Sequence, residues 1–194
     1  QVKWLLLLVL AMSMSLLAGH IQITFYLVMA VGLYAFLRKR LRLFLISYFL
    51  FLILTSFQWY PALKFTLNSN RSIEQAGALV REGFFIVPKQ LVQMVVPDFF
   101  GNSATLNYRG EWNYMEQVIY IGIIPLILAL FAILFFRGER VRKYAFLLVA
   151  GGLLMAVKNP VAELPYRLKI PVWSDLQPTR LSYLITFGLA ILAA

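Results

Sequence analysis

The chain is organised around the stretch PDFFGNSATLNYRGEWNYMEQVIY, residues 97–120. This stretch carries three of the eight acidic residues, Asp98, Glu111 and Glu116, together with a dense run of aromatic side chains. The residues that surround it are much more hydrophobic. A polar, aromatic segment that leads into an apolar run is where we expect ligand recognition or chemistry.

The composition of the whole chain predicts a membrane protein. Hydrophobic residues make up 61% of the chain and charged residues only 13%, whereas soluble domains carry about 25% charged residues. Several apolar runs approach the roughly 20 residues that a helix needs to cross a bilayer. We therefore expect an all-α integral membrane protein that forms a polytopic helical bundle.

The formal net charge of +10 does not indicate a nucleic-acid partner. Eight of the eighteen basic residues fall in two short clusters, 38–42 and 137–143, that separate apolar runs. The positive-inside rule predicts such clusters in cytoplasmic loops. The chain has no cysteine, which excludes disulfides and thiolate metal sites within it.

The apolar runs predict about six transmembrane spans within one domain, residues 1–194. The expected spans are 4–19, 21–37, 43–60, 114–136, 144–157 and 181–194. Alternation of these spans places the two basic clusters in the cytoplasm and the loops 61–113 and 158–180 outside the cytoplasmic membrane. The two ends of the chain indicate an internal piece of a longer protein.

The outer loops are expected to differ in structure. The larger loop should contain two short interfacial helices, 72–81 and 88–96. In the second of these, a helical period places Gln90 and Gln93 away from the apolar face. The loop 158–180 carries four prolines and is expected to be extended.

The fourth span has a recognisable start. Asn113 and Glu116 have the spacing of a helix N-cap and its N3 carboxylate. We therefore expect a helix from about residue 114 that passes through Pro125 as a tolerated kink.

Several candidate binding residues lie at the predicted outer ends of spans. His20 and Gln22 either line a polar cavity or satisfy backbone groups of a tight turn, and the sequence leaves both interpretations open. Arg180 suits a phosphate or pyrophosphate group, and contact with anionic lipid headgroups is the competing interpretation. The other outer arginines are Arg71, Arg81 and Arg109.

The carboxylates of the central stretch also have alternative roles. Asp98 and Glu111 could act as a general base or bind a divalent metal through oxygen, but no DxD or HxxxH spacing supports a metal. No cofactor is predicted. The plainer interpretation is that Asp98 caps a turn and that Glu111 pairs with Arg109.

Glu116 lies among aromatic residues. It is either stabilised by the dipole of its helix, or it faces a cavity and binds a hydroxyl-rich ligand. The rings of Tyr108, Trp112 and Tyr114 would suit stacking on a sugar, although Trp and Tyr also mark membrane interfaces.

Four blocks resemble the bacterial YfhO family of membrane proteins. They are LLAGHIQITFYLVMAVGLYAFL (16–37), PDFFGN (97–102), YRGEWNYMEQVIYIGIIPLILAL (108–130) and PTRLSYLITFGLAILAA (178–194). Their order and spacing agree with the family, and the third block is the most specific. The first block departs from the family pattern, which has Pro where this chain has Ile21.

The resemblance implies a relative of the type C glycosyltransferases. These enzymes transfer a sugar from a polyprenyl-phosphate carrier to an envelope acceptor such as lipoteichoic acid, outside the bacterial cytoplasmic membrane. The implied partners are the lipid bilayer, the lipid-linked donor and an envelope glycan. The catalytic carboxylate of such enzymes typically lies in a first external loop that we expect this piece to lack, so the catalytic residues stay unassigned. The matched positions expected to face the outer cavity are His20, Gln22, Glu111, Asn113, Tyr114 and Glu116.

Two other functions remain open. A transporter or flippase of a lipid-linked substrate would show broken helices with polar residues near the bilayer midplane, whereas the polar residues here gather at the predicted outer ends. A non-catalytic membrane scaffold is the third possibility.

Overall fold

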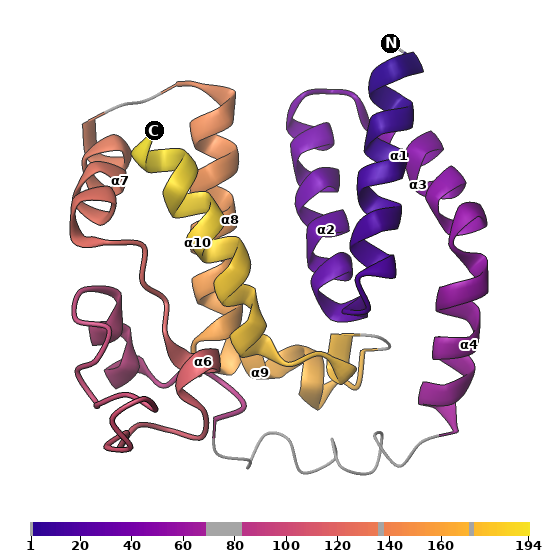
Figure 1. The fold of residues 1–194 in the computed structure, drawn as a ribbon. Helices are drawn as coiled ribbons and strands as arrows, with labels where there is room; N and C mark the ends of the chain where they lie inside the picture. The colour runs from indigo at the N-terminus through magenta and orange to yellow at the C-terminus, as the bar shows by residue number, and fades with distance from the viewer. Residues whose placement is uncertain (1, 69–82, 136–137, 171–172) are drawn as a thin grey trace. The chain divides into compact units, whose positions relative to one another are not determined.

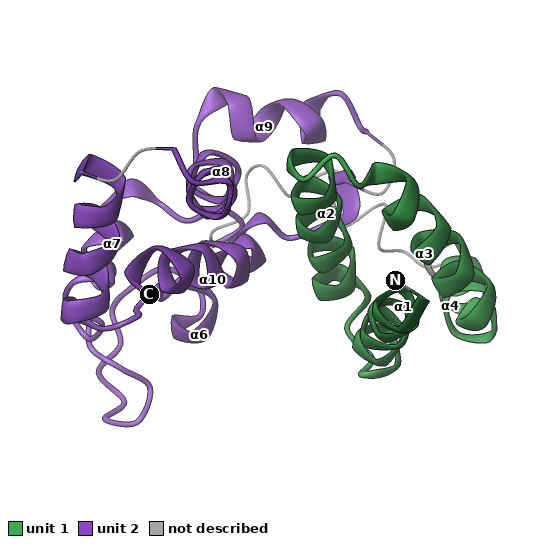
Figure 2. Cartoon of the chain, turned by 90° about the horizontal axis from the view of Figure 1, so that it is seen from above, with its two compact units in different colours: residues 1–72 green, residues 73–194 purple. Residues whose placement is uncertain are grey.

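A computed structural model describes residues 2–68, 83–135, 138–170 and 173–194. Within these residues the regular elements are helices, and one isolated bridge pairs Ile86 with Val157 (Figure 1). The all-α prediction is therefore confirmed for the described part of the chain. The chain divides into two compact units, residues 1–72 and 73–194 (Figure 2), which we describe separately.

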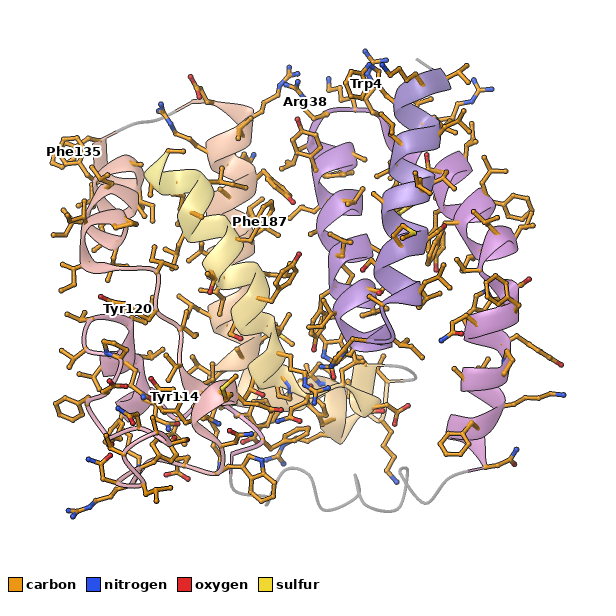
Figure 3. All side chains as sticks on the ribbon, in the orientation of Figure 1. Trp4, Arg38, Tyr114, Tyr120, Phe135 and Phe187 are labelled. Carbon is orange, nitrogen blue, oxygen red and sulfur yellow. The ribbon has the colours of Figure 1, made fainter. Side chains whose placement is uncertain are left out.

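Unit 1 is built on a helical hairpin with a third helix packed against it. Its elements are α1 (Val2–Leu17), α2 (Ile21–Leu37), α3 (Leu41–Leu54) and α4 (Ser56–Leu67). The core joins Val9, Met12 and Leu16 of α1 to Phe51 of α3. Trp4 and Arg38 lie at the same end of this unit, so the first basic cluster is at the end where α1 begins (Figure 3).

Polar side chains lie inside the α1–α2 hairpin. Ser15 and Thr24 share a hydrogen bond of 3.0 Å across the two helices, and the buried Gln22 donates to the buried Tyr26 hydroxyl at 2.9 Å. Large apolar side chains, by contrast, are exposed on the same two helices, and extensive apolar surface marks contact with a membrane, a ligand or another protein. These exposed residues include Trp4, Leu6, Leu10, Met14, Ile21 and Phe36.

Unit 2 is a group of longer helices with short elements gathered at one end. Helix α10 packs against both α8 and α7, and Gly188 of α10 faces the carbonyl oxygen of Ala145 in α8. The elements are η1 (Pro88–Met94), α6 (Tyr114–Gln117), α7 (Ile123–Phe135), α8 (Arg140–Ala156), α9 (Pro160–Arg167), η2 (Trp173–Asp175), η3 (Pro178–Leu181) and α10 (Ser182–Ala193).

A second core fastens the segment after residue 82 to the end of α8. The Ile86 N–H donates to the Ala156 carbonyl, and the Lys158 N–H donates to the Ile86 carbonyl, each at 2.9 Å. Next to this pairing, the rings of Phe84 and Tyr166 meet edge to face at 5.1 Å. The polar stretch of the chain is therefore built on a segment that is held by both backbone and side chains.

The prediction of six membrane spans is wrong. In the described part of the chain, no single helix is long and apolar enough to cross a membrane. One pair of helices, Leu41–Leu54 with Ser56–Phe65, meets the requirements of length and composition, but it is bent by 74°.

Local breaks divide two of the predicted spans. Within the expected span 43–60, the helix ends at Thr55, whose hydroxyl donates to the Phe51 carbonyl at 2.7 Å. Within the expected span 114–136, α6 ends after four residues, and Gly122 takes a left-handed backbone with φ of +97°. Helix α7 begins only after this glycine, so Pro125 lies in its first turn, where a missing N–H costs nothing. The prediction of a kink at Pro125 is therefore also wrong.

The loop 158–180 is not extended as predicted in its described part, because two of its four prolines, Pro160 and Pro178, begin helices. Asn159 caps α9 by accepting from the N–H groups of Val161 and Ala162, and Pro160 occupies the first helical position. Pro178 likewise opens η3. Proline fixes a helical φ and loses no hydrogen bond at such positions.

The predicted interfacial helix 88–96 exists with a different period. Residues Pro88–Met94 form a 3₁₀ helix, in which side chains three residues apart lie on the same side. Gln90 and Gln93 consequently share the buried side, contrary to the prediction. The other predicted helix, 72–81, lies outside the described residues, as do Arg71 and Arg81.

The contact between α10 and α8 gives a first prediction, for Gly188→Ala. A Cβ atom at Gly188 would lie 2.8 Å from the Ala145 carbonyl oxygen and 2.8 Å from a Val149 methyl group. We expect the free energy of unfolding to fall by about 1 kcal/mol, since overpacking of about 1–3 kcal/mol outweighs the higher helix propensity of alanine. Thermal unfolding followed by circular dichroism measures this loss.

Gly151→Ala is the matched control. A Cβ atom at Gly151 would contact nothing within 4 Å, so this variant should be as stable as the unsubstituted chain or more stable. Equal destabilisation by both variants would contradict the close packing at Gly188.

Candidate functional site

The central polar stretch folds at one end of unit 2. In Figure 3, Tyr114 and Phe135 mark opposite ends of this unit, Tyr120 lies between them, and nitrogen and oxygen atoms concentrate around Tyr114. Helix α8 begins with the basic residues of the second cluster, at the end of the unit where α7 finishes. The polar stretch and this cluster therefore occupy opposite ends of unit 2.

Asp98 receives hydrogen bonds from two side chains of the stretch. The Tyr114 hydroxyl donates to its Oδ1 atom at 2.6 Å, and Asn102 donates to its Oδ2 atom at 3.2 Å. The Asn113 side chain accepts from the Met115 N–H at 3.1 Å, which confirms the predicted N-cap. These contacts bring Asp98, Asn113 and Tyr114 together.

Tyr108 connects the stretch to η1. Gln90 donates to the Tyr108 hydroxyl at 3.1 Å, and this hydroxyl donates to the Glu111 carbonyl at 2.9 Å. The rings of Tyr108 and Tyr114 are perpendicular, with centroids 5.6 Å apart. The stretch therefore presents a pair of ordered aromatic rings.

Both tyrosines are harder to ionise than usual. Burial raises the pKa of Tyr108 and the negative charge of Glu111 adds to this rise, while the hydrogen bond from Gln90 opposes it. The hydrogen bond to Asp98 raises the pKa of Tyr114. Both hydroxyls therefore stay protonated, as donors, at neutral pH.

Glu111 forms an ion pair with Lys89 of η1. The Lys89 Nζ atom lies 2.8 Å from its Oε1 atom. The partner is therefore Lys89 instead of the predicted Arg109, whose backbone N–H donates to the Phe100 carbonyl at 2.8 Å and whose side chain is exposed. Because the lysine side chain is largely exposed, this pair contributes little to stability. The Glu111 side chain itself is partly buried, with 22% of its surface exposed.

Glu116 joins α6 to the segment that precedes α10. Its Oε2 atom accepts from Gln177 and, at 3.2 Å, from the Thr179 hydroxyl, while its Oε1 atom pairs with Arg180 at 3.4 Å. Glu116 and Arg180 are 64 residues apart in the sequence. The sequence singled out both residues separately, but nothing in their local spacing indicates that they meet.

Trp112 has a fixed backbone and an exposed ring. Its φ of +42° is unusual for a residue with a side chain, and its Cβ atom lies where a side chain at Gly83 would be. Gly83 itself has a φ of +72°, and its carbonyl accepts from the buried Gln117 at 3.1 Å. The Trp112 side chain is nevertheless 57% exposed.

Three buried glutamines support the site, and the sequence missed their role. Through their amide groups Gln90, Gln93 and Gln117 donate to Tyr108, to the Pro97 carbonyl and to the Gly83 carbonyl. Their carboxamide oxygens have no partner within the described residues. Glutamine is seldom fully buried, so apolar periodicity alone predicted the opposite orientation for the first two.

His20 and Gln22 belong to unit 1. His20 is exposed and caps α2, with its Nδ1 atom accepting from the Ile23 N–H at 3.4 Å. Gln22 is buried and donates to Tyr26. This geometry supports the interpretation that His20 satisfies a backbone group of the turn.

The arrangement offers aromatic faces and hydrogen-bonding groups. Within the described residues, no three His, Cys, Asp or Glu side chains come together as ligands for a metal ion. Asp98 and Glu111 can accept hydrogen bonds from a ligand, and the amides and hydroxyls around them can donate. Comparison of the chain with known protein families, with curated proteins and with solved structures gives no match.

The contact between Asp98 and Tyr114 gives a second prediction. Asp98→Asn should lower the pKa of Tyr114 towards that of an ordinary tyrosine, because the charged acceptor that favours the protonated phenol is lost. Since the pKa of Tyr114 is raised on folding, this bond stabilises the loop fully below pH about 10. The stabilisation is lost as the pH rises through the folded pKa. Titration of ¹³C-labelled tyrosine by NMR, assigned with Tyr114→Phe, measures the change.

Asn102→Ala is the control for this prediction. It removes the donor to the other oxygen of Asp98 and should leave the pKa of Tyr114 raised. An unchanged Tyr114 titration in Asp98→Asn would contradict the contact.

Proposed function

We propose that unit 2 presents a carbohydrate-binding face of a membrane glycosyltransferase. The enzyme would transfer a sugar from a polyprenyl-phosphate carrier to an envelope acceptor such as lipoteichoic acid, at the outer side of the bacterial cytoplasmic membrane. The resemblance of four sequence blocks to the YfhO family and the chemistry of the site support this proposal.

The exposed ring of Trp112 carries the proposal. A pyranose has one face of C–H groups that packs on an aromatic ring, and its hydroxyls bond to carboxylates and amides at the rim. Trp112 combines a largely exposed side chain with a Cβ atom that packs closely against Gly83, and this packing would reduce the number of torsions that stacking has to order. Restricting motion before binding lowers the entropy cost of binding.

The polar groups that would contact sugar hydroxyls lie in the same stretch as this ring. Glu111 and Asn113 are its neighbours in the chain, and Glu111 is partly exposed beside its Lys89 partner. Asp98 and Tyr114 form the exposed hydrogen-bonded pair next to Tyr108. Carboxylates accept from hydroxyls and the amide can do both, so the set suits a polyhydroxylated ligand.

The exposed Arg109 is our candidate for contact with the lipid phosphate. A guanidinium matches a phosphate through two parallel hydrogen bonds. The charge of Arg180 is compensated by Glu116, whereas Arg109 is exposed within the same stretch as Trp112. The proposal therefore moves the phosphate contact from Arg180 to Arg109 and gives Arg180 a structural role.

These residues would bind and orient the reactants. In the proposed reaction, a base takes the proton of an acceptor hydroxyl, whose oxygen attacks the anomeric carbon and displaces the lipid phosphate. Holding the sugar ring and stabilising the leaving phosphate both lower the barrier. We assign no base, because all three carboxylates of the stretch already have partners in the protein. Glu116 accepts three hydrogen bonds, Asp98 accepts two, and Glu111 pairs with Lys89.

The distribution of apolar surface supports contact with a membrane. Helix α7 exposes Ile124, Ile127 and Leu134, and side chains between Tyr120 and Phe135 in unit 2 are mostly carbon (Figure 3). The basic start of α8 lies at the other end of the unit from the site. With the positive-inside rule, this polarity favours an outward-facing site.

A transporter or flippase of a lipid-linked substrate is the second candidate, and one observation favours it. Transporters use broken helices, and α3 and α4 are bent by 74° around Thr55. However, the Thr55 N–H and hydroxyl both donate to the Phe51 carbonyl, so these donors are already used within the helix. The bend between α3 and α4 therefore supports a transporter less strongly than the chemistry of the site supports a glycosyltransferase.

The experiment compares Trp112→Ala with Trp4→Ala in the full-length protein, reconstituted in liposomes with a polyprenyl-phosphate sugar as donor and lipoteichoic acid as acceptor. We expect Trp112→Ala to weaken donor binding and slow sugar transfer about tenfold, since an aromatic stacking contact contributes about 1 kcal/mol or more. Trp4 is an exposed tryptophan of unit 1, and its loss should change neither quantity.

Two outcomes would contradict the proposal. Full donor binding by a folded Trp112→Ala variant would exclude Trp112 as the stacking ring. Movement of the intact donor across the bilayer, with no sugar transferred by the unsubstituted full-length protein when the acceptor is present, would favour the transporter.

A further inference from the structure

Helix α9 lies across the long helices of unit 2. Figure 1 shows it running sideways from the end of α8, and in Figure 2 it is seen lengthwise while α8 is seen along its axis. Both views agree that α9 is transverse to α8. A membrane surface perpendicular to α8 would therefore run along α9.

One face of α9 is apolar and exposed. Val161, Leu164 and Leu168 follow each other at spacings of three and four residues, which places them on one side of a helix. Their side chains are 51%, 50% and 63% exposed. The other side of α9 is occupied, because Ala162 and Tyr166 are buried against Phe84 and Phe85.

Basic residues stand at both ends of this stripe. Lys158 precedes α9 and Lys169 follows it, and both are exposed. Arg167 and Glu163 pair at 2.7 Å on the polar side of the helix. The segment 158–169 therefore has three basic residues against one acidic residue, a net charge of +2.

We propose that α9 is an interfacial helix seated on a leaflet that contains anionic phospholipid. The apolar stripe would enter the boundary between headgroups and acyl chains, and Lys158 and Lys169 would contact lipid phosphates, as in other in-plane amphipathic helices. A helix of eight residues is about 12 Å long. Its stripe is much smaller than the roughly 800 Å² per partner of a stable protein interface, so a lipid surface fits better than a protein.

Contact of α9 with the leaflet would set the distance of the candidate site from the membrane surface. The buried side of α9 holds Phe84, and the preceding residue, Gly83, lies directly beneath Trp112. Seating α9 on the leaflet therefore fixes the height of the segment on which the site is built. The inference rests on the proposed membrane location and does not depend on sugar binding at Trp112.

Site-directed spin labelling tests the inference in the full chain, because the chain contains no cysteine of its own. Leu164→Cys and the control Arg167→Cys are each labelled and placed in nanodiscs of phosphatidylcholine with or without phosphatidylglycerol. We expect the label at 164 to be relaxed more by oxygen than by a water-soluble nickel chelate, and the label at 167 to show the reverse. Adding phosphatidylglycerol should shift the label at 164 deeper.

A second variant tests the charges. Lys158→Gln combined with Lys169→Gln should abolish the shift with phosphatidylglycerol while the label at 164 stays in the apolar region.

A label at 164 that is more accessible to the nickel chelate would overturn the inference in favour of water. Protection from both reagents would overturn it in favour of a protein contact, and a retained lipid shift without the lysines would overturn their role. These readouts are independent of sugar transfer, so failure here and failure of the Trp112 experiment are distinguishable.

Discussion

The backbone pairing of Ile86 with the end of α8 supports everything at the polar end of unit 2. Through this residue, two hydrogen bonds of 2.9 Å tie an otherwise irregular segment to a long helix. The residues just before Ile86 contact two different parts of unit 2. Phe84 and Phe85 fasten α9, and Gly83 receives Trp112 and Gln117.

A second connection closes the same region from the other side. Glu116 reaches three side chains that precede α10, and α10 packs on α8. The polar stretch is therefore held at Gly83 and at Glu116 by two segments that both lead back to α8. Between these points, the tyrosines and Asp98 are ordered by bonds within the stretch and to η1.

The sequence predicted the features that depend on neighbouring residues. The cap at Asn113 follows from spacing, and the all-helical fold follows from composition. The helix breaks at Thr55 and Gly122 were missed because membrane-like apolar runs hide them. The sequence does not reveal α9 because four prolines in one loop favour an extended structure, although Asn159–Pro160 is a good helix start. An α-helical period predicted Gln90 and Gln93 on the polar side of their helix. The segment is a 3₁₀ helix, which repeats every three residues, so both side chains lie on its buried side. The ion pairs of Glu111 and Glu116 depend on tertiary contacts that no local pattern contains.

The polar interior of the α1–α2 hairpin bears on how this chain can change over evolution. Its outward positions touch no protein core, so one apolar residue can replace another there with little effect. Ser15 and Thr24 share a hydrogen bond between the two helices, and the Thr24 hydroxyl also donates to the His20 carbonyl at 3.4 Å. Loss of Thr24 therefore removes the partner that Ser15 has on the other helix. Related chains should therefore drift quickly on the outside of this hairpin and should keep a hydrogen-bonding residue at position 24 wherever Ser15 is kept.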